Sequence, residues 1–533
     1  MNFKSTYIDY QNTGLFSNLV KDYVQDKGTA RSFGVFEPTY KGVEESIEQR
    51  KKYPVNRKVL VEVLQKQYLS LPINNKVQAN VELLHKENSF VVTTAHQPNI
   101  FTGPLYFFYK IIHAIQLAED LKKRYPENNF IPVYYMGSED ADIEEVGSFV
   151  LGGTKYQWDT KQTGAVGRMK VDDALLQLLR NLEGYWSVKP EGKEALAIIQ
   201  SAYQKGKTIA DATIELVHGF FGDKGLLVVQ PDDASLKSLF NKTIQKELLT
   251  GFSHKAIQPT LQSLSAAYHV QSEGRSLNLF YLKDALRSRI EKQGDHFIIA
   301  DTDIRFSETE ILEELEAFPE RFSPNVILRG VFQETILPGI VFIGGGGELA
   351  YWLELKNVFA EAGVHMPVLQ LRNSFLSIRA KQLQQWKSLG LSIEDLFKPI
   401  LDIEIAFVKM QSGVLLSLEA ELKSLEQVYD QVQKRVKSID ATLGAHANNL
   451  AHQSYKKLLE LEKKMIRAER RKQTVSIERI HAIKNALFPN NGLQERVENI
   501  AEWLGDYGMD WLDAIIAASP TMQQQFTIVD QID

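Results

Sequence analysis

Hydrophilic residues and glycines cluster at five places in this sequence, each directly after a predicted β-strand. The clusters are His96-Gln97-Pro98, Ser138-Glu139-Asp140-Ala141-Asp142, Gln230-Pro231-Asp232-Asp233, Gly344–Gly347 with Glu348, and Arg372-Asn373-Ser374. Such side chains can bind anions, hold amines or transfer protons. In an open α/β sheet, ligands bind beyond the carboxyl ends of the strands. The five clusters therefore predict one shared pocket at that edge of a sheet.

The first cluster joins a histidine to the start of a helix. His96 could orient a phosphate, serve as a general acid or base, or hydrogen-bond to an oxyanion; holding the strand–helix turn is the structural alternative. The loop after it leads to Gly103 and Pro104, where the free N–H groups of a helix N-terminus suit an anion. We therefore expect a negatively charged ligand group near Gly103.

The second cluster places several acids in close succession. Glu139, Asp140 and Asp142 could hold a metal ion, a substrate amine or hydroxyl groups. Alternatively, acids in a first helical turn complement the helix dipole, with Ser138 as an ordinary N-cap. A helix N-terminus alone does not call for so many acids, so we favour a functional role for the group.

The glycine run Gly344–Gly347 permits either a sharp turn or the close approach of a ligand to the backbone. It is not a P-loop, because no lysine follows, and Leu349 stands where a dinucleotide fingerprint has its last glycine. Arg329, with Gln333 or Glu334, could reach the same pocket. A salt bridge to a carboxylate is the structural alternative for the arginine.

Hydrophobic periodicity predicts the elements that position these clusters. The β-rich segments 90–95 and 130–137 flank a helical pattern that begins near Pro104, which together indicate a βαβ unit. Strand patterns return at 225–230, 339–344 and 366–372. The segments 147–172 and 276–306 are instead typical of short antiparallel strands, inserted at the rim of the sheet. The fold class is therefore α/β, a doubly wound parallel sheet with inserted antiparallel elements.

After the sheet, leucines at heptad spacing predict a coiled coil. The a/d positions run from Leu415 to Ile439 and, after a short break, from Leu458 to Ala468. Two such helices joined by a turn form an antiparallel coiled-coil arm; two bundle helices packed on the core are the alternative.

Composition excludes several functional classes. The net charge of −6 argues against nucleic-acid binding. The absence of cysteine excludes disulfides, a thiolate nucleophile and Cys-ligated metals. Neither a signal-peptide pattern nor an apolar run long enough for a bilayer occurs, so we expect a cytoplasmic protein without a membrane partner.

Five segments, in this order, resemble the cysteine ligase family of bacillithiol biosynthesis, the cysteine-adding enzyme. They are TAHQPNIFTGPLYFFYKI, PVYYMGSEDADIEEV, SPNVILRGVFQETILPGIVFIGGGGELAYWLEL, MPVLQLRNS and FPNNGLQERVENI, and the resemblance runs from about residue 90 to the C-terminus. It implies a Rossmann-like core with a coiled-coil arm used in dimerisation. It also implies nucleotide binding and the addition of cysteine to glucosaminyl-malate.

The resemblance divides the chain into four expected parts. These are an N-terminal helical part of the core (1–89), the Rossmann-like core (90–385), the helical coiled-coil arm (386–485) and a C-terminal segment that packs back on the core (486–533).

Carried over residue by residue, the resemblance also implies the site. The catalytic candidates are His96, Gln97, Glu139, Asp140, Asp142 and Arg329. The nucleotide-binding candidates are Gly103, Ser138, Gly344, Gly345, Gly346, Gly347, Glu348 and Arg372. The same pocket is also expected to include Asn325, Tyr351 and Ser374. No protein-held metal is expected. Some members of the family have glutamine in place of His96, so we expect that residue to position or hydrogen-bond a ligand rather than act as an indispensable base.

Amide formation between a cysteine carboxylate and a sugar amine requires activation. We expect ATP to convert the carboxylate to an acyl-adenylate or acyl-phosphate, with ATP or ADP as the cofactor and Mg²⁺ as an option for the acids. Gly103 and Gly344–Gly347 would hold phosphates, and Arg329 or Arg372 would hold a carboxylate. A homodimer through the arm is expected. The alternatives are a nucleotidyl- or glycosyltransferase on the same sheet, or a non-catalytic coiled-coil adaptor that binds a nucleotide.

Overall fold

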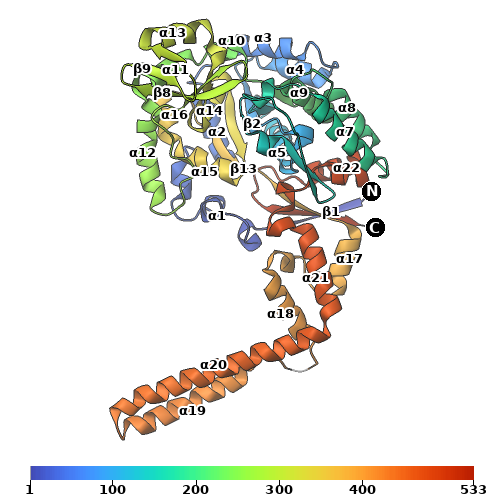
Figure 1. Cartoon of the computed structure of the whole chain (residues 1–533), viewed down its shortest axis with the longest axis vertical. Coiled ribbons are helices and arrows are strands. Elements are labelled where there is room, and N and C mark those ends of the chain that lie inside the picture. Colours follow the sequence, from blue (N-terminus) through green and yellow to red (C-terminus); the bar gives the residue numbers. More distant parts are fainter. Residues whose placement is uncertain (1, 414, 533) are drawn as a thin grey trace. The chain divides into compact units, whose positions relative to one another are not determined.

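The computed structural model describes residues 2–413 and 415–532, which form two compact units (Figure 1). The first unit contains most of the chain, namely residues 2–11, 15–377 and 492–532. The second contains residues 12–14 and 378–491. In the described residues, no helix combines the length and the apolar character needed to cross a lipid bilayer.

A five-stranded parallel sheet lies at the centre of the first unit. Its spatial order is β13-β12-β2-β3-β6, and every neighbouring pair is parallel. The strands are β2 (Ser89–His96), β3 (Asn129–Met136), β6 (Leu227–Val229), β12 (Gly339–Gly344) and β13 (Val368–Leu371). Counted along the chain, this is the order 5-4-1-2-3 of a doubly wound Rossmann-type sheet. The predicted fold class is therefore confirmed.

Helix α5 (Tyr106–Arg124) is the crossover between β2 and β3 and packs against both strands. Phe108 on one side contacts Phe220 and Phe221 of α9 (Ile209–Phe221), whereas Ala114 and Leu117 share a hydrophobic cluster with residues of α2 (Tyr40–Arg50) and β12. A helix that is buried on several sides needs apolar residues around most of its circumference, which explains the sequence YFFYKIIHAIQLA. The helix begins at Tyr106 rather than at Pro104, after a 3₁₀ turn at Ile100–Thr102.

Two antiparallel insertions interrupt the parallel sheet. The first is the hairpin of β4 (Ser148–Leu151) and β5 (Thr154–Gln157). The second is a five-stranded sheet of order β10-β9-β8-β7-β11. Its strands are β7 (Leu279–Lys283), β8 (Leu286–Gln293), β9 (His296–Ile299), β10 (Arg305–Ser307) and β11 (Phe322–Pro324). This inserted sheet extends past the predicted end at residue 306, because β11 returns to pair with β7.

The chain termini form a third sheet that the sequence analysis missed. Strand β1 (Asn2–Ile8) pairs antiparallel with β15 (Phe526–Ile532), and β14 (Ser374–Ile378) completes the order β1-β15-β14. The N-terminal part predicted as helical (1–89) therefore begins with a strand. The pairing joins segments more than 500 residues apart, and local periodicity carries no signal for such a contact.

The second unit contains the predicted coiled-coil hairpin of α19 (Glu419–Lys437) and α20 (Ala441–Lys472). The helices are antiparallel, because Leu418 contacts Glu462 whereas Gln433, further along α19, contacts Asn448. The break expected between the two heptad helices is a short turn, because α20 already begins at Ala441. Asp440 caps this helix by accepting a hydrogen bond from Thr442 N at 2.8 Å. Three shorter helices complete the unit: α17 (Ala380–Ser388), α18 (Ile400–Gln411) and α21 (Thr474–Leu487).

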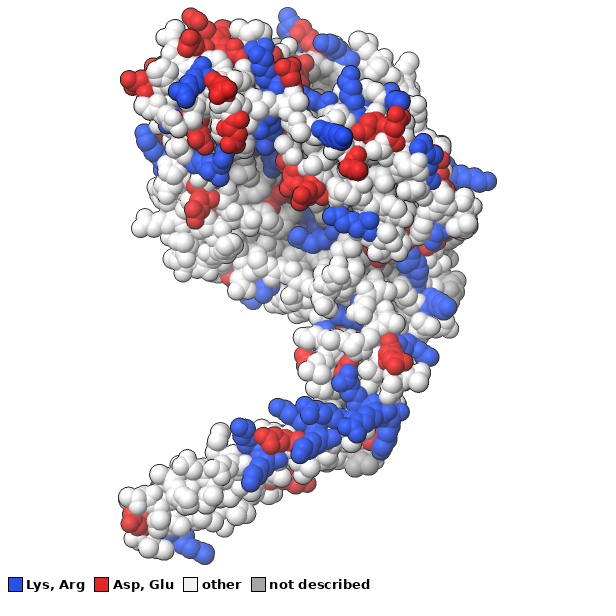
Figure 2. Space-filling view, in the orientation of Figure 1, with Lys and Arg blue, Asp and Glu red and all other residues white. Residues whose placement is uncertain are grey.

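Charge is distributed unevenly along α20. Residues 441–455 contain no Asp, Glu, Lys or Arg, whereas residues 456–472 are rich in Lys and Arg. Figure 2 shows the basic side chains gathered on one stretch of the hairpin.

Candidate active site

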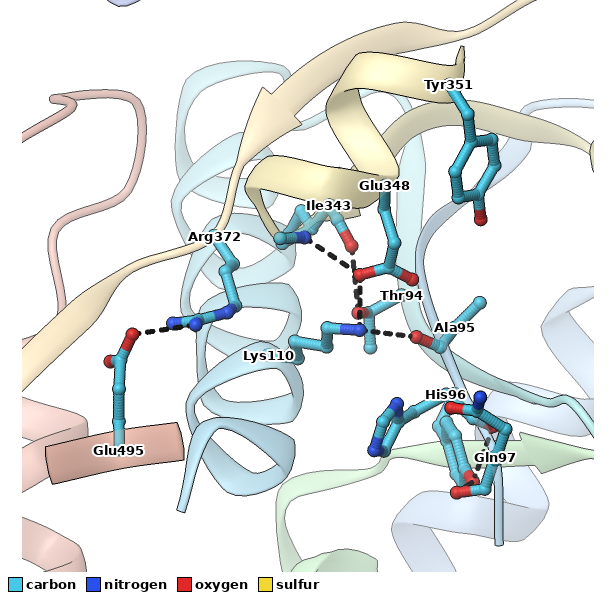
Figure 3. Close-up of polar contacts among 12 residues, drawn as sticks. Thr94, Ala95, His96, Gln97, Lys110, Ile343, Glu348, Tyr351, Arg372 and Glu495 are labelled. Carbon is cyan, nitrogen blue, oxygen red and sulfur yellow. Dashed lines mark hydrogen bonds and ion pairs between the residues drawn. The ribbon is translucent and has the colours of Figure 1, made fainter. Parts of the chain in front are cut away.

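The carboxyl ends of β2 and β12 form the topological switch point of the parallel sheet. The strand that follows β2 in the chain, β3, is its neighbour on one side in the sheet. Its neighbour on the other side is β12, which comes much later in the chain. Loops that leave two such neighbouring strands diverge and create the crevice in which α/β proteins bind ligands. His96 and Gln97 follow β2, and Gly345 with Glu348 follows β12, so two predicted clusters lie at this point (Figure 3).

His96 is buried at the end of β2, with its ring centroid 5.1 Å from that of Tyr106. Its Nε2 atom finds no hydrogen-bond partner in the part of the chain that the structure describes. Burial, and after it the charges of nearby cations, hold the pKa of His96 well below its ordinary value. These cations are Lys110, Arg329 and Arg372. The imidazole is therefore neutral near pH 7 and can exchange a hydrogen bond with a ligand without carrying charge.

Lys110 connects the two strand ends, and the sequence analysis missed it. From the buried face of α5 it donates to Ala95 O at 2.9 Å and forms an ion pair with Glu348 (Figure 3). Glu348 in turn accepts a hydrogen bond from Gly345 N at 2.8 Å. A lysine inside an otherwise apolar helix face needs a buried partner. The position of Lys110 within the apolar pattern was therefore a sequence signal for a buried ion pair. Lys110 thus ties the end of β2 to the first turn of α15 (Gly346–Glu354).

Steric contacts explain part of the glycine run. A Cβ atom on Gly344 would lie only 2.9 Å from the Phe342 ring, whereas one on Gly345 would make an ordinary contact, 3.5 Å from Arg372 Nε. By contrast, a Cβ atom on Gly347 would meet nothing within 4 Å. Gly346 and Gly347 line a cavity of about 730 Å³ together with Tyr268, Arg496 and the first residues of α1 (Asn18–Gln25). The N-terminus of α15 is therefore open to a ligand.

Arg372 is buried after β13, and most of its guanidinium is already engaged. Its NH2 group pairs with Glu495 Oε1 at 2.7 Å, and its NH1 group donates to Asn373 O and Ser374 Oγ (Figure 3). Among the described residues, only Nε of this guanidinium has no hydrogen-bond partner. Glu495 lies in the quoted segment FPNNGLQERVENI but was not recognised as a site residue. Two of the three nitrogen atoms of Arg372 are thus engaged, and one of them forms a salt bridge.

A second cavity, of about 390 Å³, lies beyond β2 and β3. Its lining includes the predicted residues Gln97, Ser138, Glu139, Asp140, Asn325 and Arg329, and also Tyr135, Gly137, Pro231, Phe280, Arg287, Ser323, Pro324 and Val326. Arg329, from α14 (Val326–Ile336), donates through NH2 to Tyr351 OH at 2.7 Å. Tyr351 raises the pKa of Arg329, which stays charged.

The acidic cluster divides into cavity and capping residues. Asp140 accepts from Gln97 Nε2 at 3.2 Å, and its other oxygen accepts from the backbone N–H of Ala141 at 2.7 Å. Asp142 is exposed, does not line the cavity and caps the short helix α6 (Ile143–Val146). The predicted N-cap at Ser138 thus lies at Asp142 instead.

Glu139 lines the cavity but is paired inside the protein. It forms an ion pair with the buried Lys237, which lies 3.6 Å from Asp232; Arg168 donates to the same Asp232 at 2.6 Å. Burial raises the pKa of Glu139, although Lys237 opposes this shift. The sequence analysis missed both cations, because nothing local relates residues 168 and 237 to the end of β3.

Gly103 lies apart from both cavities. Its turn is buried, and Asn499 Nδ2 donates to Gly103 O at 2.7 Å and to Phe101 O at 2.8 Å. The helix start that was expected to hold a phosphate is therefore packed against the C-terminal segment. Within the described residues, no three Asp, Glu or His side chains have the arrangement of a metal site.

Comparison with known proteins now assigns the family. The model described as "Bacillithiol biosynthesis BshC, N-terminal Rossmann-like domain" matches residues 3–373. The model described as "Bacillithiol biosynthesis BshC, C-terminal coiled-coil domain" matches residues 375–531. This chain belongs to the BshC family.

Curated relatives agree over nearly the full length. Proteins named "Putative cysteine ligase BshC" from Cytophaga hutchinsonii and Flavobacterium johnsoniae are 37% and 36% identical to this chain. The first match covers 94% of both chains, and the second covers 98% of this chain and 99% of the relative. The same name is given to a Bacillus cereus protein that is 28% identical over 84% of this chain and 87% of its own. The resemblance seen in the sequence is thus confirmed at the level of the BshC family.

Proposed function

We propose that this protein joins the carboxylate of cysteine to the amine of glucosaminyl-malate, the last step of bacillithiol biosynthesis, after a nucleotide has activated the carboxylate. One observation carries the proposal: the buried His96 lies at the topological switch point, where the charges of Lys110, Arg329 and Arg372 help to keep its imidazole neutral. Buried cations beside a neutral hydrogen-bonding group suit a carboxylate that gains negative charge on its oxygen during acyl transfer. The names of the full-length relatives supply cysteine as one substrate, and the family resemblance of the sequence implies glucosaminyl-malate as the other.

The residues around the glycine run fit a nucleotide phosphate. Gly346 and Gly347 open the N-terminus of α15 to the 730 Å³ cavity, and free N–H groups at such a position bind phosphate. Arg372 Nε is buried without a hydrogen-bond partner beside Gly345. When bound, ATP would turn a carboxylate oxygen into a leaving group. Since no protein-held metal site is found in the described residues, we propose that any Mg²⁺ enters with the nucleotide.

The second cavity fits the organic substrates. Arg329 carries a permanent charge and has no carboxylate partner among the described residues, so it can hold a substrate carboxylate. Asp140 can accept a hydrogen bond from a substrate amine or hydroxyl group, because it lines the cavity. His96 would hydrogen-bond to the oxygen that becomes negative when the amine attacks.

A direct assay tests this function. Purified protein is incubated with cysteine, glucosaminyl-malate and ATP, and the products are measured by mass spectrometry. We expect the cysteinyl amide together with a hydrolysed nucleotide. No product with any nucleotide would count against the proposal. Turnover of a sugar nucleotide without cysteine would instead indicate a nucleotidyl- or glycosyltransferase, and nucleotide binding without turnover would indicate the adaptor.

We also propose a homodimer formed through the arm. Several apolar side chains of the α19–α20 hairpin remain about half exposed: Val428, Val432, Leu443, Leu450 and Leu461. A two-helix hairpin cannot cover both sides of its own apolar stripe, and a second copy could. Light scattering coupled to gel filtration should report a dimer, and the double substitution Val432→Glu/Leu450→Glu should give a monomer. A monomeric wild-type protein at micromolar concentration would contradict the proposal.

A further inference from the structure

The inserted antiparallel sheet forms one wall of the 390 Å³ cavity. Phe280 on β7, Arg287 on β8 and Ser323 on β11 come from this sheet, whereas Gln97 and Asp140 come from the ends of parallel strands. The shape and charge of the cavity therefore depend on an element that is not part of the parallel sheet. Insertions of this kind are common carriers of substrate selectivity, because loops and added elements vary while the scaffold stays the same.

Arg287 is the charged residue of this wall, and it has no ion-pair partner among the described residues. Its guanidinium carbon lies 3.8 Å from the centroid of the Phe280 ring, which orients the group by stacking. Its Nε atom is buried without a hydrogen-bond partner, and the guanidinium forms no ion pair with the described residues. Burial lowers the pKa of Arg287, although Asp140 and Glu139 oppose that shift. An oriented arginine with unused donors inside a cavity is suited to an anionic ligand.

Arg329 places a second guanidinium on the same cavity. Both guanidinium groups line this cavity, and the charge of Arg329 lowers the pKa of Arg287, although by less than Asp140 and Glu139 raise it. The acids nearby do not neutralise them fully, because Glu139 is paired with Lys237 and one oxygen of Asp140 is held by Ala141 N. Two cations that share a cavity are stabilised when anionic groups lie between them. Two guanidinium groups match two carboxylates, whereas cysteine has only one.

We propose that Arg287, with Arg329 beside it, binds the malyl carboxylates of the sugar substrate, so that the inserted sheet selects a dicarboxylate-bearing glycoside. This proposal rests on the proposed function, because it assigns one of its two substrates to the 390 Å³ cavity. The carboxylate of cysteine would then bind closer to His96 and the switch point.

Calorimetric titration of the full-length protein tests the assignment without turnover. Glucosaminyl-malate, cysteine and methyl glucosaminide, a glycoside without carboxylates, are titrated separately into wild type, Arg287→Gln and Arg305→Gln. Arg305 is the matched control, since it lies exposed on β10 of the same inserted sheet. Loss of a charge-assisted hydrogen-bond pair should weaken glucosaminyl-malate binding about 10- to 100-fold in Arg287→Gln. Binding of cysteine and of methyl glucosaminide should stay unchanged, and Arg305→Gln should behave as wild type.

A measurement on the unaltered protein covers the case in which Arg287→Gln does not fold. Phenylglyoxal modifies accessible arginines, and mass spectrometry locates the modified residues. Glucosaminyl-malate should slow the modification of Arg287 but not that of Arg305, and methyl glucosaminide should protect neither. Protection of Arg287 by cysteine alone, or an equal loss of glucosaminyl-malate binding in both variants, would overturn the assignment.

The two proposals can fail separately. If glucosaminyl-malate binds through Arg287 but no amide forms with any nucleotide, the ligase function fails and the dicarboxylate site stands. If the amide forms in Arg287→Gln with an unchanged KM for glucosaminyl-malate, the ligase function stands and the dicarboxylate site fails.

Discussion

The two ends of helix α14 carry charged residues in opposite settings. Near its start, Arg329 lines a cavity of about 390 Å³ and has only Tyr351 as a side-chain hydrogen-bond partner. Near its end, Glu334 is buried beside Arg50, whose NH2 group donates to Glu334 O at 3.0 Å and to Leu337 O at 2.7 Å. Before the structure was known, both residues were candidates for the same pocket.

The Glu334 end leaves no space for a ligand. A Cβ atom on Gly339, the first residue of β12, would lie 2.1 Å from Glu334 Oε2, so glycine is required there by the carboxylate itself. The prediction that Gln333 or Glu334 reaches the pocket is therefore wrong, since α14 runs from the carboxyl edge of the sheet to its amino edge. On α14, the arginine that faces a cavity without a carboxylate partner is thus the candidate ligand contact, whereas the enclosed Glu334 beside Arg50 is a structural residue.

The largest expected effect is on stability at the closed end. Arg50→Ala would leave the Glu334 carboxylate and two carbonyl groups without their partner, which costs about 3–5 kcal/mol. We expect a clear fall in the melting temperature, measured by differential scanning calorimetry. The exposed neighbour Lys51 supplies the control, because Lys51→Ala should change stability by less than about 0.5 kcal/mol. A melting curve of Arg50→Ala that matches this control would break the comparison.

At the open end, the effect should appear in activity. Arg329→Met removes a charged donor from the cavity, and loss of such a group lowers kcat/KM by about 100-fold. The melting temperature should change little, because Arg329 contributes one hydrogen bond to Tyr351 and no carboxylate pair. Steady-state kinetics and calorimetry on the same preparation check both halves of the prediction. A large fall in stability with normal kinetics would show that the two ends of α14 have the same structural role.

A conservative change at the same position should have a smaller effect. Arg329→Lys keeps the charge but loses the planar fork, so we expect about a tenfold rise in the KM of the carboxylate substrate. The kcat should change less than in Arg329→Met. Kinetics at saturating concentrations of the other substrates give kcat and KM separately. Identical kcat and KM values for Arg329→Lys and Arg329→Met would show that charge at residue 329 is irrelevant.

The smallest expected effect is a dependence of stability on pH at the closed end. Burial raises the pKa of Glu334 from 4.5 to about 7, although Arg50 opposes this shift. The folded state therefore binds this proton more tightly, so the contribution of Glu334 to stability is complete below about pH 4.5 and is lost as the pH rises through about 7. Glu334→Gln cannot titrate. Relative to this variant, wild type should melt at a lower temperature at about pH 8 than at about pH 5, and parallel curves would contradict the assignment.

Much of the site's position could be predicted from the sequence, since polar clusters at strand ends are a local signal. His96, Gln97, Asp140 and Gly345 follow their strands as expected. Lys110 could not be predicted as a link between β2 and α15, because its partner Glu348 is 238 positions away in the chain. Arg287 was missed for the same reason, since it faces the cavity only after the inserted sheet has folded over the strand ends.

The sequence by itself determined the alternation of strands and helices, the heptad hairpin and the clusters of polar residues, because these depend on the periods of neighbouring residues. The tertiary structure alone sets which charges are neutralised and which face open space. Glu495 pairs with Arg372 and Lys237 pairs with Glu139, whereas Arg287 has no ion-pair partner among the described residues. Charge pairing depends on distances between residues far apart in the chain, and folding alone sets those distances.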